Sequence, residues 1–143
     1  MAHIFGLTVM NDITARDLQR RHDQWFKGKG LDNSAPMGPC VVTLDSIADL
    51  GALELTTFVN GEERQRGRVA QMIFDIPEII AQLSAGMTLE PGDIIATGTP
   101  SGVGYAMDPP RVLKAGDVVE CAVSGIGTLV TTITPGGPTP HPG

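Results

Sequence analysis

Three polar side chains follow an apolar run near the start of the sequence: the carboxylate of Asp12, the guanidinium of Arg16 and the amide of Gln19. The apolar run predicts a buried strand over residues 4–11, and the pattern after it predicts a helix over residues 15–24. Arg16 and Gln19 are three residues apart and share one face of this helix. Asp12 lies beside its N-terminus, where the helix dipole favours negative charge. Such a group suits a metal ion and an anionic substrate that carries a carbonyl group.

The same stretch also has an ordinary structural interpretation. Thr14 and Asp17 have the spacing of a capping box, with a hydroxyl at the N-cap and a carboxylate three residues later. An aspartate before a helix is commonly a cap, and an arginine in a first turn is commonly solvated. Because short motifs also match by chance, the spacing alone leaves both interpretations open.

Two later segments add donors of the same chemical kind. Lys29 lies between two glycines in a predicted loop over residues 25–37, and a lysine there can hold a carboxylate or an enolate as a point charge. The glycine-rich segment 97–104 includes Gly98 and Thr99, whose N–H groups and hydroxyl can bind an oxyanion. No Gly-Lys-Ser/Thr follows these glycines, which argues against a nucleotide. Together the segments suit a small di-acid or keto-acid.

The elements that would position these groups are mostly short strands. Eighteen glycines, eleven prolines and few aromatic residues favour turns over a helix bundle. Asn60-Gly61 is a strong hairpin signal, and Asp75 with Glu78 predicts a capped second helix. We therefore expect a mixed α/β protein that is mainly β. Further strands are predicted over residues 40–44, 53–59, 62–68, 94–96, 118–123 and 128–134.

Composition excludes some classes of protein. The net charge of −6, without a basic patch, argues against nucleic-acid binding. No apolar run approaches the roughly 20 residues that a membrane span needs. Cys40 and Cys121 are far apart and are predicted to be buried free thiols in a reducing compartment, so we expect a soluble, cytoplasmic protein. The Pro- and Gly-rich tail, residues 135–143, is predicted to be disordered.

Several motifs, in order and with matching gaps, resemble the fumarylacetoacetate hydrolase family from about residue 5 to residue 133. The resemblance implies a catalytic domain over residues 1–134 with a mixed β-roll and short flanking helices. It also implies Mg²⁺ or Mn²⁺ and a homodimer. The implied activity is hydrolysis, hydration, isomerisation or decarboxylation of a small 2-oxo acid, such as an acylpyruvate, a fumarylacetoacetate-like compound or oxaloacetate. The matching segments are residues 11–19, 24–25 with 28–29, 36–39, 59–62, 72–74, 91–93 with 97–104, and 125–127.

The resemblance also implies roles for individual residues. Asp12 corresponds to a metal-binding aspartate, and a hard cation with oxygen ligands suits a 2-oxo acid. Lys29 and Thr99 are implied to be catalytic. The residues implied to bind the substrate are Arg16, Gln19, Gly98 and Thr99.

One feature of the family is missing from the sequence. The family takes two further metal-binding glutamates from a Glu-x-Glu motif before the Asn-Asp motif, and no Glu-x-Glu occurs here. Asp12 alone would be a poor magnesium site. We therefore expect either the C-terminal part of a longer enzyme or a truncated, non-catalytic domain that serves in binding or oligomerisation. In either case, the absence of the neighbouring strands would leave strand edges unpaired and apolar surface exposed, which predicts self-association.

Overall fold

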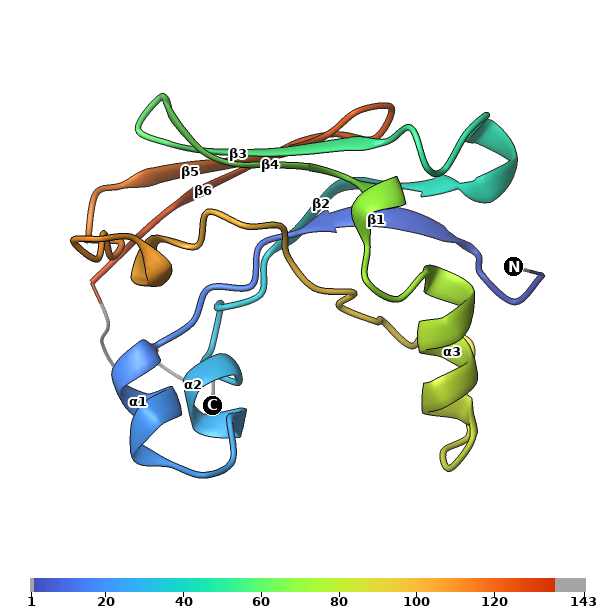
Figure 1. Ribbon diagram of the computed structural model, residues 1–143, viewed down its shortest axis with the longest axis horizontal. Helices are drawn as coiled ribbons and strands as arrows, with labels where there is room; N and C mark the ends of the chain where they lie inside the picture. The colour runs from blue at the N-terminus through green and yellow to red at the C-terminus, as the bar shows by residue number, and fades with distance from the viewer. Residues whose placement is uncertain (1, 136–143) are drawn as a thin grey trace, which may run out of the picture.

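The computed structural model describes residues 2–135 and contains two antiparallel sheets with three short α-helices (Figure 1). Nearly all of the tail predicted to be disordered lies outside the described residues. In Figure 1 the four-stranded sheet forms the upper layer, and a two-stranded sheet crosses beneath it. Helices α1 and α2 lie below one end of these layers and α3 lies below the other. The chain is thus mixed α/β and mainly β, as the sequence predicts.

The four-stranded sheet has the strand order β4–β3–β5–β6. Its strands are β3 (Glu54–Val59), β4 (Glu62–Arg68), β5 (Val118–Val123) and β6 (Gly127–Thr132). The predicted hairpin is confirmed, since Asn60 and Gly61 join β3 to β4 with φ angles of 53° and 79°. The side chain of Asn60 also donates to Asp117 (2.9 Å), and this hydrogen bond lowers the pKa of the Asp117 carboxyl.

The two-stranded sheet pairs β1 (Gly6–Met10) with β2 (Met37–Thr43). The main core lies where these strands meet β5 and β6. On β5 every second residue is buried, which is the period of a strand with one face on the core. The buried residues of this core are Val9, Leu53, Val119, Cys121, Val123 and Ile126.

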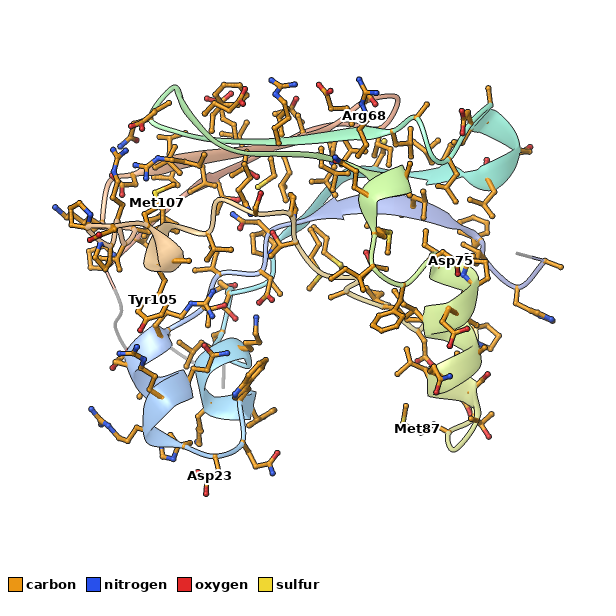
Figure 2. The ribbon with its side chains drawn as sticks, viewed as in Figure 1. Asp23, Arg68, Asp75, Met87, Tyr105 and Met107 are labelled. Atoms are coloured by element: carbon orange, nitrogen blue, oxygen red, sulfur yellow. The ribbon has the colours of Figure 1, made fainter. Side chains whose placement is uncertain are left out.

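The predicted second helix is α3 (Ile76–Ser84), and its predicted N-cap is confirmed: the Asp75 carboxylate accepts a hydrogen bond from the Glu78 N–H at 2.8 Å. Asp75→Ala removes this acceptor and is expected to lower the free energy of unfolding by about 1 kcal/mol. Chemical denaturation followed by circular dichroism measures the loss. Asp23→Ala, at an exposed aspartate near the end of α1 (Figure 2), is the matched control, and equal losses in the two variants would contradict the cap.

Four predictions of local structure and burial are wrong. Helix α1 covers only Arg16–Arg21, because the backbone adopts an extended conformation at His22. A one-turn helix, α2 (Phe26–Lys29), forms inside the predicted loop. Residues 94–96 form no strand, because no described strand pairs with them. Cys40 is exposed, whereas Cys121 is buried as predicted.

Short 3₁₀ turns complete the chain. They are η1 (Leu44–Ser46), η2 (Val69–Gln71) and η3 (Gly104–Ala106). No helix among residues 2–135 has the length and apolar character needed to cross a membrane.

Candidate active site

The structure brings Asp12, Thr14 and Lys29 together around one ammonium group. Lys29 Nζ forms an ion pair with Asp12 Oδ2 and lies 3.2 Å from Thr14 Oγ1, to which it donates. The Lys29 side chain is 33% exposed and that of Asp12 is 45% exposed, so both are open to a ligand. The prediction that Asp12 and Lys29 belong to one site is therefore consistent with their positions.

Backbone hydrogen bonds explain how residues 17 positions apart reach each other. Beyond β1 the chain runs beside the segment that leads into β2: Asn11 N–H donates to Pro36 O (3.0 Å), and Ile13 N–H to Ser34 O (2.9 Å). At the start of α1, Ala15 N–H donates to Gly28 O (2.9 Å). These bonds hold α2 against the chain around Asp12.

Helices α1 and α2 approach closely at a glycine. A Cβ atom added at Gly28 would lie 2.7 Å from Cβ of Gln19, so a larger residue would push the two helices apart. Ser34 fixes the end of α2 from the other side: its buried hydroxyl contacts Lys29 O (2.9 Å) and Leu31 O (2.7 Å). Sequence reasoning did not identify Ser34, because its role depends on backbone carbonyls that no motif reveals.

The capping box predicted for α1 is wrong. The N-cap is Ala15, without a side-chain cap. The Thr14 hydroxyl instead donates to Asp12 O (3.3 Å) and accepts from Lys29. Because this hydroxyl is turned toward the ammonium group, it cannot serve the helix N-terminus, and Thr14 joins the site rather than the helix cap.

Arg16 and Gln19 do share one face of α1. Arg16 Nη1 donates to Gln19 Oε1 at 2.8 Å, as their spacing predicts. The guanidinium has further N–H groups that can bind a carboxylate in a bidentate manner. Tyr105, in η3, places its ring centroid 5.7 Å from Cζ of Arg16, so this face of α1 is next to the end of the glycine-rich segment.

The glycine-rich segment packs along β4, and Lys29 makes its side-chain hydrogen bonds to Asp12 and Thr14 instead. Gln65 on β4 donates through Nε2 to Thr99 Oγ1 (2.8 Å) and to Pro100 O (2.9 Å). Gly98 has a φ angle of +107°, and no atom lies within 4 Å of the position of a Cβ there. Thr99 and Gly98 are thus exposed donors on a fixed segment, and Gln65 is a positioning residue that the sequence did not indicate.

The described residues do not form a complete metal site. Residues 2–135 contain no group of three or more His, Cys, Asp or Glu side chains that could hold an ion. The Asp12 carboxylate is engaged by Lys29. Because Mg²⁺ needs several oxygen ligands, these residues alone do not fit it.

The fold and these motifs define a family. The sequence profile of the fumarylacetoacetate (FAA) hydrolase C-terminal domain matches residues 1–134, and the chain belongs to this family. Oxaloacetate tautomerase YisK of Bacillus subtilis is 56% identical over 131 residues, which are 92% of this chain and 44% of that protein. The human mitochondrial oxaloacetate tautomerase FAHD2A is 44% identical over 135 residues, which are 93% of this chain and 43% of that protein.

A solved structure confirms the expected fold. Fumarylacetoacetate hydrolase from psychrophilic Exiguobacterium antarcticum superposes with a TM-score of 0.90 at 48% identity, over 93% of this chain and 48% of the other. The chain therefore has the fold of this family, and the three similar proteins described above are named as enzymes. It spans about half the length of the relatives it matches.

Proposed function

We propose that this chain carries part of the active site of an enzyme that interconverts the enol and keto forms of a small 2-oxo di-acid, with oxaloacetate as the first candidate. The observation that carries the proposal is the Lys29 ammonium, held between Asp12 and Thr14 and open to solvent. Two relatives named as oxaloacetate tautomerases, at 56% and 44% identity, support the choice of reaction.

Tautomerisation moves a proton between the carbon next to the keto carbonyl and the oxygen of that carbonyl, through an enolate. We assign to solvent water the removal of the proton from one of these atoms and its return to the other. An ammonium group has three donors. In Lys29, two are directed to Asp12 and Thr14, and we assign the third to the oxygen on which the enolate charge develops. A fixed donor of this kind stabilises the enolate in both directions of the reaction. Asp12 keeps the ammonium group in place and balances its charge.

The carboxylates of the substrate need separate donors. Arg16, held by Gln19, offers a guanidinium to one carboxylate. Thr99 and Gly98 offer a hydroxyl and a backbone N–H from the glycine-rich segment, and we assign them to the other end of the di-acid. This division uses all six residues that the sequence singled out, with Lys29 at the reacting oxygen.

We further propose that Asp12 contributes one oxygen ligand to Mg²⁺ or Mn²⁺ and that the other ligands come from outside residues 2–135. Lys29 engages only Oδ2 of Asp12, so the carboxylate would have its other oxygen to offer as a ligand. Calorimetric titration of the full-length protein with Mg²⁺ tests this assignment: binding should weaken at least tenfold in Asp12→Asn. Unchanged binding in that variant would remove Asp12 from the ligand set.

We also propose a self-associating, cytoplasmic protein that acts without nucleic acid or membrane. Free thiols and the acidic composition support the location and the absence of nucleic acid. Exposed apolar side chains support self-association; the most exposed are Phe5, Trp25, Phe26, Ile73 and Phe74. Size-exclusion chromatography with light scattering should show a dimer or larger species, and a stable monomer would contradict this.

A panel of substrates tests the reaction class. The full-length protein, with and without Mg²⁺, is given the enol form of oxaloacetate, keto oxaloacetate and an acylpyruvate. Faster loss of enol absorbance, without release of pyruvate, is the expected result. Release of pyruvate from oxaloacetate, or cleavage of the acylpyruvate as the main activity, would replace tautomerisation by decarboxylation or hydrolysis. Inactivity on all three substrates would favour the non-catalytic alternative.

A further inference from the structure

Tyr105 links the glycine-rich segment to helix α1 through two arginines. Its ring centroid lies 4.7 Å from Cζ of Arg20 and 5.7 Å from Cζ of Arg16, both within the range of a cation–π interaction. In Figure 2, Tyr105 lies between the η3 turn and α1. Tyr105 is the sole tyrosine of the chain, and no sequence motif singled it out.

The turn that carries Tyr105 is anchored to the sheet. Within it, Ala106 N–H donates to Val103 O (2.8 Å), and Arg111 N–H donates back to Gly104 O (2.8 Å). Arg111 in turn donates through Nη2 to Glu62 Oε2 on β4 (2.7 Å). This hydrogen bond from Arg111 lowers the pKa of the Glu62 carboxyl, so the anchor stays ionised to a lower pH than an ordinary glutamate would. Tyr105 is therefore presented from a fixed support.

A second contact strengthens this support. The side chain of Arg64, also on β4, is 12% exposed, and its Nη1 lies 3.4 Å from Sδ of Met107. Met107 follows η3 directly, and Figure 2 shows it on the side of the turn nearer the sheet. The turn is thus held to β4 by two residues that follow Tyr105, Met107 and Arg111, while the ring faces α1.

We propose that Tyr105 is a positioning residue that orients the Arg16 guanidinium for a substrate carboxylate. Gln19 holds this guanidinium at Nη1, and the ring of Tyr105 limits its movement on another side. The remaining N–H groups of Arg16 are then held in a fixed, parallel arrangement, which suits bidentate binding of a carboxylate. The proposal rests on the proposed function, because it requires Arg16 to bind substrate.

The test uses the full-length protein with three single variants. Tyr105→Leu removes the π face and should raise KM about three- to thirtyfold, with kcat within about twofold of wild type. Tyr105→Phe keeps the ring and should restore KM to within about twofold. Arg20→Ala removes the other, exposed arginine on the same ring and should leave KM within about threefold. A loss mainly in kcat, or an equal KM effect in Arg20→Ala, would overturn the proposal.

A double-mutant cycle identifies the residue through which Tyr105 acts. In an Arg16→Ala background, Tyr105→Leu should change KM by less than about twofold, because the group that it orients is gone. An undiminished effect in that background would mean that Tyr105 acts elsewhere.

The same cycle measured by calorimetry with oxalate, with and without Mg²⁺, needs no turnover and separates the two proposals. A protein inactive on oxaloacetate that still shows the coupling in oxalate affinity would refute the reaction but keep the role of Tyr105. An active protein without the coupling would support the proposed reaction and refute the proposed positioning role of Tyr105. A wild-type protein that binds no oxalate and turns over no oxaloacetate would refute both.

Discussion

Lys29→Ala is expected to lower the turnover number of the full-length protein at least ~100-fold, the loss typical of removing one positioned donor at a developing oxyanion. Its ammonium group is fixed by the Asp12 carboxylate and by Thr14 Oγ1 at 3.2 Å, and no other cation among the described residues forms an ion pair with Asp12. Steady-state kinetics with oxaloacetate measures the change. Lys29→Arg keeps the charge but not the compact geometry, and we expect it to recover only part of the rate.

Lys27 is the matched control, because it lies in the same one-turn helix and is exposed. Lys27 follows Phe26 and has a glycine on one side only, whereas Lys29 lies between Gly28 and Gly30, which let the chain pack closely. Lys27→Ala should stay within about threefold of wild type, since surface substitutions are usually worth less than ~0.5 kcal/mol. Equal losses at the two lysines, or a larger loss at Lys27, would mean that the site is elsewhere.

Gly102→Ala is expected to lower the free energy of unfolding by about 2–5 kcal/mol. Gly102 has a φ angle of +101°, and a Cβ there would lie 1.9 Å from the carbonyl oxygen of Arg64 on β4. The estimate adds about 1–2 kcal/mol for a left-handed conformation in a residue with a Cβ to about 1–3 kcal/mol for overpacking. Chemical denaturation measures the loss, and oxalate affinity should fall as well, because Thr99 lies on the same segment.

Gly86→Ala is the control for this substitution. Gly86 follows α3, and no atom lies within 4 Å of the position of its Cβ. Its replacement should change the free energy of unfolding by less than about 1 kcal/mol. If Gly102→Ala were as mild as Gly86→Ala, the glycine-rich segment would not be packed on β4 as the structure places it.

Parts of the fold that depend on neighbouring residues could be predicted from the sequence. The hairpin at Asn60-Gly61 and the N-cap at Asp75 are local, and both are confirmed. Residues 94–96 have a strand-like sequence but form no strand, since a strand also needs a partner across the sheet. The exposure of Cys40 has the same origin, because the burial of a strand depends on what lies against its face.

In the candidate site, too, local features could be predicted from the sequence and contacts between distant residues could not. Asp12 and Lys29 could be selected from motifs and family resemblance, and the pairing of Arg16 with Gln19 followed from helix spacing. The contact of Tyr105 with Arg16 joins residues 89 positions apart and depends on the path of the chain around β4, which no spacing rule describes. Thr14 was predicted to cap helix α1 but instead accepts a hydrogen bond from Lys29. A hydroxyl near the start of a helix can bond either to the helix N–H groups or to a neighbouring cation, and the spacing does not distinguish the two.

The most direct test of the proposed enolisation site follows the enol absorbance of oxaloacetate with the full-length protein and its Lys29→Ala variant, each with and without Mg²⁺. We predict that wild type accelerates the decay of the enol far above the uncatalysed rate, without forming pyruvate, and that the variant loses at least ~99% of this acceleration. Acceleration that survives Lys29→Ala undiminished, or a wild-type protein that does not accelerate the decay under either condition, would contradict the account.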